Sequence, residues 1–163
     1  VEMGLELKRL PSRSPATERD DALRGKGYYT RPARPDEVVL VARQFHPRHT
    51  NLMGQEAWNA LARGLTPQAL VVCEHRRQLI GFAALLGWTL DGDAPVLGPV
   101  FVQPVHRDTG LADVLLRHAL VAAKEAGKAR VRVFCEADAT GLYETGGLGV
   151  AARYCRHATA ELE

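Results

Sequence analysis

A short turn with one arginine and one glycine is where residue types and spacing in this sequence first suggest chemistry. It reads Arg107-x-x-Gly110-x-Ala112 and stands before a segment with helical spacing of apolar residues. The first amides of a helix have no partner within the helix and carry partial positive charge. Gly110 allows a ligand to approach the backbone, and Arg107 adds a full charge with forked donors. The turn suits a diphosphate, although an ordinary strand–turn–helix corner with a surface arginine would have the same pattern.

The elements around this turn follow from the pattern of apolar residues. A valine-rich run from Val96 is stopped by Pro104, which is typical of the end of a strand. Beyond the turn, apolar residues recur at helical spacing, and Gly127 is a natural terminator. The helical positions are Leu111, Val114, Leu115, Ala119 and Ala122. A strand, a tight turn and a helix are therefore predicted between Val96 and Gly127.

The residues on both sides of the turn resemble those of a known family. The segment Leu97–Pro104 reads Leu-x-Pro-Val-x-Val-x-Pro, and the segment Glu136–Leu148 follows after a strand-like run at 129–135. The former, with the turn, is similar to the acyl-CoA-binding segment of the GNAT superfamily of N-acetyltransferases. The latter resembles that family's later helix, which usually reads asparagine, alanine, Leu-Tyr-Glu and Gly-Phe. The resemblance extends roughly from Tyr29 to the C-terminus.

The resemblance implies an α/β protein with the GNAT fold, a mixed and mostly antiparallel sheet with a splayed central strand pair and helices on both faces. The apolar patterns give a matching order of elements: strand, two helices, three strands, helix, strand, helix, strand. We expect the first strand at Gly27–Pro32, the second helix near Gly54–Leu65, a hairpin turn at Asp91–Asp93 and one or two closing strands after Val150.

The segment before the first of these strands has a different character. Residues 27–163 are expected to form the GNAT domain, and residues 1–26 an N-terminal extension or linker. The run Pro11–Lys26 is polar, charged and rich in breakers, which indicates irregular structure. Three leucines nearer the start alternate with charged residues, which fits either a tail or a short strand that pairs with a sheet edge. They are Leu5, Leu7 and Leu10.

By the same resemblance, the chain is an acetyl-CoA-dependent N-acetyltransferase that acts on an amine of a small molecule or peptide. The turn would hold the pyrophosphate of the cosubstrate, and backbone groups of the preceding strand would line its pantetheine arm, as a peptide adds to a sheet edge. The implied cofactor-binding residues are Phe101, Val102, Gln103, Arg107, Asp108, Thr109, Gly110, Leu111, Ala112 and Tyr143. The acceptor would be selected by the loop at 47–53, the hairpin at 88–94 and the region near the C-terminus, and its identity cannot be read from them.

Acyl transfer also needs an acid for the leaving thiolate and a neutral amine. Tyr143 is the candidate acid, because the family often has a tyrosine at this place; otherwise it packs under the cofactor as a wall. A free thiol has a pKa of roughly 8.5 and a phenol of roughly 10, so the transfer needs a tuned site. No base stands out in the sequence: Glu136, His46, His49, Glu74 or a chain of water molecules could serve. Glu136 is placed at the mouth of the expected cleft, although a solvated strand end is the preferred interpretation of this residue.

Several positions depart from the family pattern. Asp108 stands where a glycine is usual and brings a carboxylate into the anion-binding turn, and Thr109 stands where a basic residue is common. Glu136 replaces an asparagine and Leu148 a phenylalanine. These changes leave another interpretation open, a degenerate GNAT module that binds acyl-CoA or a protein partner without catalysis. The start without methionine leaves a further one, one half of a tandem acetyltransferase.

Composition bounds the remaining classes. The 163 residues are 46% hydrophobic and 25% charged with a net charge of +2, which suits one globular domain and implies no strong attraction to nucleic acid or membranes. Three widely spaced cysteines give no disulfide framework, so a cytoplasmic location is expected. The pairs Cys73-x-His75 and Cys155-x-His157 could each chelate a metal, but coincidence is the preferred interpretation and no metal is expected. A homodimer is implied by the family alone.

Overall fold

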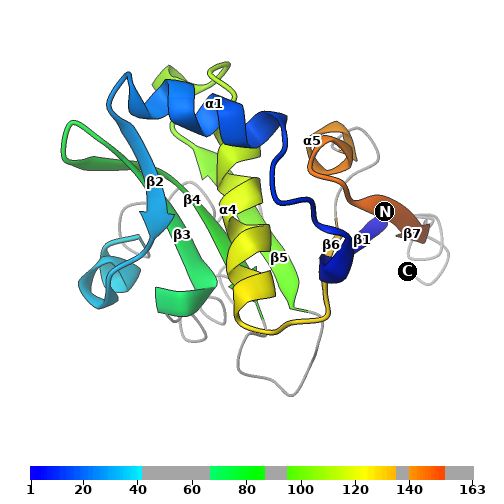
Figure 1. Cartoon of the computed structure of the whole chain (residues 1–163). Coiled ribbons are helices and arrows are strands. Elements are labelled where there is room, and N and C mark those ends of the chain that lie inside the picture. The colour runs from blue at the N-terminus through cyan, green and yellow to red at the C-terminus, as the bar shows by residue number, and fades with distance from the viewer. Residues whose placement is uncertain (42–66, 87–94, 135–139, 153–163) are drawn as a thin grey trace, which may run out of the picture.

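The computed structural model of the chain describes residues 1–41, 67–86, 95–134 and 140–152. These residues contain one sheet with the strand order β2-β3-β4-β5-β6-β1-β7 (Figure 1). Neighbouring strands are antiparallel except for β5 and β6, which are parallel. The strands are β1 (Glu2–Glu6), β2 (Tyr28–Pro32), β3 (Leu70–His75), β4 (Gln78–Leu86), β5 (Val96–Val102), β6 (Arg130–Phe134) and β7 (Gly149–Ala152). The expected mixed, mostly antiparallel sheet is confirmed.

Helices cover both faces of this sheet. On one face α4 (Leu111–Glu125) crosses the strands, and α1 (Pro15–Arg24) lies across α4 near its N-terminal end (Figure 1). The short helix α5 (Thr140–Thr145) packs beside α4. Helical residues 35–41 pack on the opposite face. The described residues also contain single turns of 3₁₀ helix: η1 (Leu7–Arg9), η2 (Pro67–Ala69) and η3 (Pro104–His106).

Two apolar cores follow from the alternation of side chains along the strands. The main core lies between the sheet and α4, whose inner face is fully apolar. The buried residues of α4 are Leu111, Val114, Leu115, Leu116, Ala119, Leu120 and Ala123. The other core joins Val41 to Val72, Phe82 and Phe101 on the opposite face. Each large apolar side chain buried in this way stabilises the fold by about 1.5–3 kcal/mol. The buried face of α4 therefore fixes the helix on the sheet, and with it the position of its first turn.

The N-terminal residues are more ordered than their sequence suggests. The expectation of irregular structure over Pro11–Lys26 is wrong, because the segment contains α1. Pro15 opens this helix, and the Ser14 amide donates to the Thr17 hydroxyl at 3.1 Å, which closes the first turn. Leu23 is the buried residue of the helix, so its apolar periodicity is too weak to indicate a helix. Polar contacts attach α1 to α4 instead.

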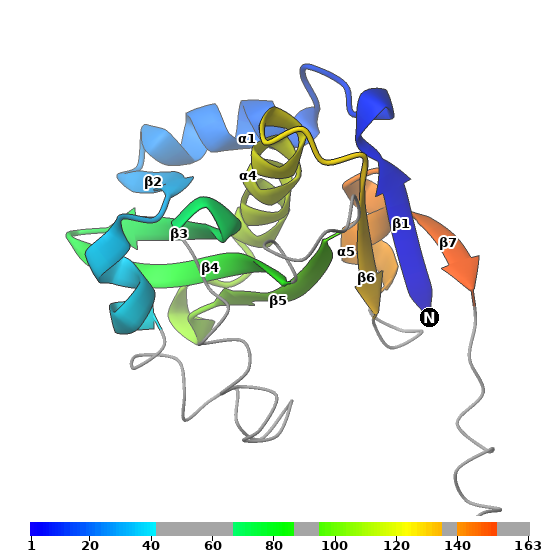
Figure 2. The same cartoon turned by 90° about the horizontal axis from the view of Figure 1, so that it is seen from below.

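The tail interpretation of the first residues is also wrong. The strand β1 lies between β6 and β7 and pairs antiparallel with both, with Met3 opposite Val133 on one side and Val150 on the other (Figure 2). Met3 is fully buried. The strand expected at Gly27–Pro32 is confirmed as β2. The helix expected near 54–65, the hairpin turn at 91–93 and the chain from 153 onward lie outside the described residues.

Candidate functional site

The centre of the sheet is splayed between its two parallel strands. β5 and β6 share one register pair, Val96 with Arg132, and the Arg132 amide donates to the Pro95 carbonyl at 3.0 Å. Beyond that pair the two strands diverge (Figure 2). From there to Val102, the edge of β5 that faces away from β4 is therefore open within the described part of the chain. The splayed pair that the resemblance implied is confirmed.

A β-bulge lies in β5 at the point where this opening begins. Leu85 of β4 pairs with Leu97 of β5, but Ala83 pairs with Val100, so β5 carries one extra residue between the two pairs. Bulges bend a strand and re-aim its backbone, and they are common beside functional sites. No local pattern in the amino-acid sequence indicates this one, because a bulge depends on the register with the neighbouring strand.

The register also decides which backbone groups of β5 face the opening. The Gln103 amide donates to the Ile80 carbonyl of β4 at 2.8 Å, so it faces β4 and not the opening. Backbone groups alternate along a strand, and Val102 and Val100 therefore present theirs to the open edge, whereas Phe101 faces β4. The expected lining of the pantetheine arm by backbone groups of Phe101, Val102 and Gln103 therefore holds for Val102, whereas Phe101 and Gln103 face β4.

At its C-terminal end β5 runs into the arginine–glycine turn and α4. Asp108 and Gly110 have left-handed backbone angles, φ 62° and 79°, and Leu111 begins the helix. The Thr109 hydroxyl donates to the His106 carbonyl at 2.8 Å and closes the turn. Aspartate is one of the few residues that adopt this conformation readily, which explains how it occupies a position where the family usually has glycine. The Asp108 side chain is exposed to solvent.

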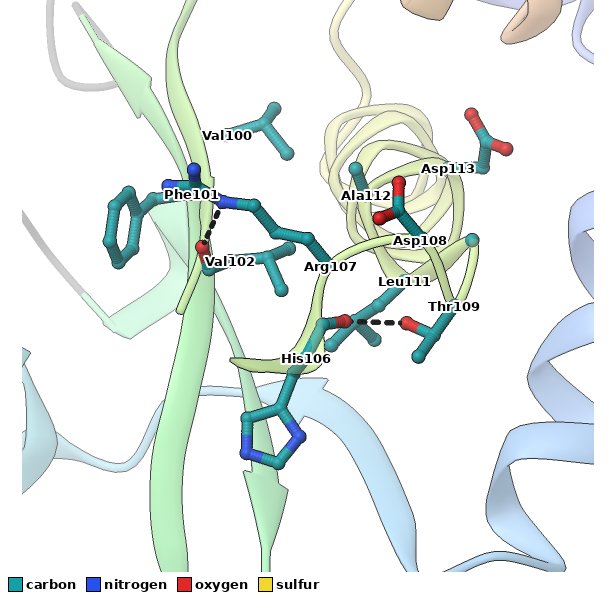
Figure 3. A pocket seen from close by; sticks show the side chains of 11 residues that line it. Val100, Phe101, Val102, His106, Arg107, Asp108, Thr109, Leu111, Ala112 and Asp113 are labelled. Carbon is teal, nitrogen blue, oxygen red and sulfur yellow. Dashed lines mark hydrogen bonds between the residues drawn. The ribbon is translucent and has the colours of Figure 1, made fainter. Parts of the chain in front are cut away.

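A cavity of about 400 Å³ lies between the end of β5 and the start of α4 (Figure 3). It collects eight of the ten residues that the sequence assigned to cofactor binding and adds three others. The lining residues are Val100, Phe101, Val102, His106, Arg107, Asp108, Thr109, Gly110, Leu111, Ala112 and Asp113. Gln103 and Tyr143 are not among them. Free amides at the start of α4, an open strand edge and this volume are a fitting place for a diphosphate that carries a long, thin arm.

Arg107 does not point at the start of the helix. Its Nε donates to the Val102 carbonyl at 3.1 Å, and its guanidinium carbon lies 5.8 Å from the centre of the Phe101 ring (Figure 3). The arginine therefore lies along the open edge of β5 and occupies a carbonyl that faces the opening.

No sequence pattern indicates the cluster of aromatic rings that Tyr28, His75 and His106 form next to the turn. The Tyr28 hydroxyl lies 2.9 Å from Nδ1 of His106, and the Tyr28 ring stacks on His75 at 4.1 Å between centroids. Burial, together with the neighbouring His75 and Arg76, holds the pKa of His106 below its ordinary value. The Tyr28 hydroxyl and Nδ1 of His106 are thus at hydrogen-bond distance, which links the two side chains. The cluster joins β2, β3 and η3 and supports the turn from below.

The candidate catalytic residues lie apart from the cavity lining or outside the described residues. Tyr143 is on α5, half-buried, and packs against the main core. Glu136, His46 and His49 lie outside the described residues. Glu74 forms an ion pair with Arg31 at 3.0 Å.

The possible metal pairs have other partners or cannot be placed. Burial raises the pKa of the Cys73 thiol to about 11, and Nδ1 of His75 lies 3.2 Å from the Gly27 carbonyl. Cys155 and His157 are outside the described residues. Among the residues with described positions, no group of three or more potential metal ligands is found.

In the same part of the chain, no helix has the length and hydrophobicity needed to cross a membrane.

Comparison with solved structures shows the same fold in several acetyltransferases. A GCN5-related N-acetyltransferase from Sphaerobacter thermophilus is 18% identical with a TM-score of 0.67, over 91% of this chain and 47% of that one. A glucosamine N-acetyltransferase region of a fungal multi-domain GH3 β-N-acetylglucosaminidase is 15% identical with a TM-score of 0.69, over 91% and 19%. YncA from Salmonella typhimurium, solved with acetyl-CoA, is 20% identical with a TM-score of 0.61, over 77% and 81%.

This chain thus spans about half of the first of these proteins and about a fifth of the next. No curated protein sequence matches it. The model of the acetyltransferase (GNAT) family matches residues 35–148, a range that includes the splayed strands, the turn and α5. The chain belongs to the GNAT acetyltransferase family.

Proposed function

We propose that the protein transfers the acetyl group of acetyl-CoA to an amine of a small molecule or peptide. The observation that carries this proposal is the open edge of β5 leading into the cavity at the start of α4. YncA, which has the same fold, was solved with acetyl-CoA as its cofactor, and this supports the choice of ligand. A homodimer is proposed on the family resemblance, and a cytoplasmic location on the three widely spaced cysteines.

In this proposal, the backbone of Val102 and Val100 pairs with the pantetheine arm, and the amides from Asp108 to Ala112 hold the pyrophosphate. Arg107 first releases the Val102 carbonyl, which frees that carbonyl for the arm and the guanidinium for a phosphate. Acetyl-CoA supplies the activated acyl group. The Val100 amide, which lies on the open edge of β5 beside the bulge, would stabilise the negative charge that develops on the thioester oxygen.

The remaining roles concern protons. The amine nitrogen bonds to the acyl carbon while the carbon–sulfur bond breaks, and the Tyr143 phenol gives its proton to the leaving thiolate. The amine proton passes to Glu136 or to water.

Tyr143→Phe should lower kcat and leave the affinity for acetyl-CoA unchanged. A weakened affinity with unchanged kcat would instead assign Tyr143 to the wall of the cofactor site.

The first test is a calorimetric titration with acetyl-CoA of the wild type, Arg107→Ala and Lys8→Ala. Lys8→Ala removes the same charge from an exposed position on η1. Micromolar binding to the wild type that is weakened by Arg107→Ala and unchanged by Lys8→Ala would support the proposed site. The next experiment would then test a panel of amines as acceptors, with release of free thiol as the readout. The absence of binding by the wild type would refute the proposal.

Another candidate is a GNAT module that binds acyl-CoA or a protein partner without catalysis. The observation that favours it is the Asp108 carboxylate in the cavity lining, with a neutral Thr109 beside it. Binding of acetyl-CoA without thiol release on any amine of the panel would favour this candidate. Asp108→Gly would then be expected to tighten acetyl-CoA binding, because a negative charge leaves the diphosphate site.

A further inference from the structure

In this structure, the cation that lies against the start of α4 comes from the N-terminal helix, because Arg107 of the arginine–glycine turn lies along β5. Arg19 of α1 lies directly against Gly110, where an added methyl group would overlap its Cδ atom and stand 2.5 Å from its Nε atom. The Arg19 guanidinium also forms an ion pair with Asp113 in the first turn of α4. Its charge is therefore held beside the amides that have no partner within the helix.

The cations expected in the turn itself are absent or lie elsewhere. Thr109 carries no charge, and its hydroxyl is bonded to the His106 carbonyl. Arg107 lies along β5 with its Nε on the Val102 carbonyl. Asp108 and Asp113 meanwhile place two carboxylates in the lining of the cavity. A diphosphate that binds there needs compensating positive charge, and Arg19 is held in contact with the turn to supply it.

The Arg19–Asp113 pair suits an exchange of partners. The two side chains are 40% and 23% exposed, so their mutual attraction is weakened by water. A guanidinium binds a phosphate with two parallel hydrogen bonds, and a diphosphate carries more charge than one carboxylate. Asp113 also lines another cavity of about 260 Å³, shared with Arg19, on the α1 side of the helix start. Asp113 therefore borders both spaces, and Arg19, which lines the one on the α1 side, reaches the start of α4 through its contacts with Asp113 and Gly110.

We propose that Arg19 binds the diphosphate of CoA and supplies the positive charge that the turn lacks, with Asp113 holding it in place until the ligand arrives. This inference rests on the proposed function. It makes α1 part of the cofactor site although α1 precedes residue 35, where the family match begins. It also explains the attachment of α1 to α4 by polar contacts.

The test is a calorimetric titration of the wild type, Arg19→Gln and the control Lys8→Gln with CoA and with 3′-dephospho-CoA. Loss of a charge-assisted bond should weaken binding about tenfold or more, equally for both ligands, in Arg19→Gln alone. Asp113→Asn should tighten binding, because it frees Arg19 and removes a negative charge. Thermal melts of each variant verify folding, and Arg19→Lys, which keeps the charge, should recover part of the affinity if Arg19→Gln is unstable.

Other outcomes would overturn the inference. A loss confined to CoA would move Arg19 to the 3′-phosphate and refute the diphosphate assignment. Equal affinity of wild type and Arg19→Gln would refute any contact with the ligand, while the proposed function would stand. Failure of the wild type to bind either ligand would instead refute the proposed function itself.

Discussion

The contact between Gly110 and Arg19 can be measured by the free energy of unfolding. Gly110→Ala forces a residue with a side chain to adopt φ 79°, a left-handed conformation that costs about 1–2 kcal/mol. The new methyl group also overlaps the end of the Arg19 side chain. Arg19 is flexible and moves away, so the extra cost is the ion pair with Asp113, about 0.2–1 kcal/mol for a partly exposed pair. The total, about 1–3 kcal/mol, is the sum of these backbone and ion-pair costs.

Gly127→Ala is the matched control for this change. Gly127 ends α4 with φ 78°, and no atom lies within 4 Å of an added methyl group, so the substitution has the backbone cost alone. Gly110→Ala should therefore cost more than Gly127→Ala by the value of the Arg19 contact. In an Arg19→Ala background the two costs should become equal, since that contact is already lost.

Thermal and urea unfolding followed by circular dichroism provide the assay, with a shift of about 2–4 °C in Tm for each kcal/mol in a domain of this size. The double-mutant cycle isolates the contact between residues 19 and 110 from the backbone term. Equal costs for the two glycine substitutions in both backgrounds would refute the placement of Arg19 on the turn.

Three further predictions concern the sheet and its charged groups. Gly81→Ala should lower Tm and weaken acetyl-CoA binding, because the added methyl group would stand 2.7 Å from the Phe101 carbonyl oxygen and push β5 away from β4. An unchanged affinity for acetyl-CoA would show that β5 does not position the ligand. Glu37 is 3% exposed and accepts two hydrogen bonds from Arg31, which hold its pKa below the ordinary 4.5. Glu37→Gln should cost about 1–3 kcal/mol at pH 7, because Arg31 keeps its ion pair with Glu74. It should also flatten the loss of stability as pH falls below about 4.5, which acid titrations of both proteins would test. The lowered pKa of His106 keeps its imidazole neutral in the folded state at pH values where the unfolded chain takes up a proton, so stability should fall as pH drops below about 6.5, and His106→Gln should remove that slope.

The parts of the fold that were predicted well are those with strong local signals. Apolar spacing from Leu111 and the glycine at 127 marked α4 correctly, and the valine-rich run marked β5. Most residues of the cavity lie in one continuous stretch, so a local motif was enough to collect them.

The parts that were missed depend on contacts between distant residues. α1 was missed because it is held by polar contacts, such as the bond between Asp20 and His118 at 2.8 Å, and polar contacts leave no apolar period. The bulge in β5 and the orientation of the Gln103 amide depend on the register with β4. Arg19 contributes to the turn from a different helix, and no spacing in the sequence relates it to Gly110.

The position of β1 also constrains how the chain folds. The strands β2 to β5 are neighbours in order, so they pair with partners close in the sequence and can form early. β1 must instead wait for β6 and β7, which lie at the other end of the chain, and its pairing closes a loop of almost the whole sequence. We therefore expect the part of the sheet made of β6, β1 and β7 to form last in refolding. Substitution of the buried Met3 should accelerate unfolding and leave the refolding rate almost unchanged.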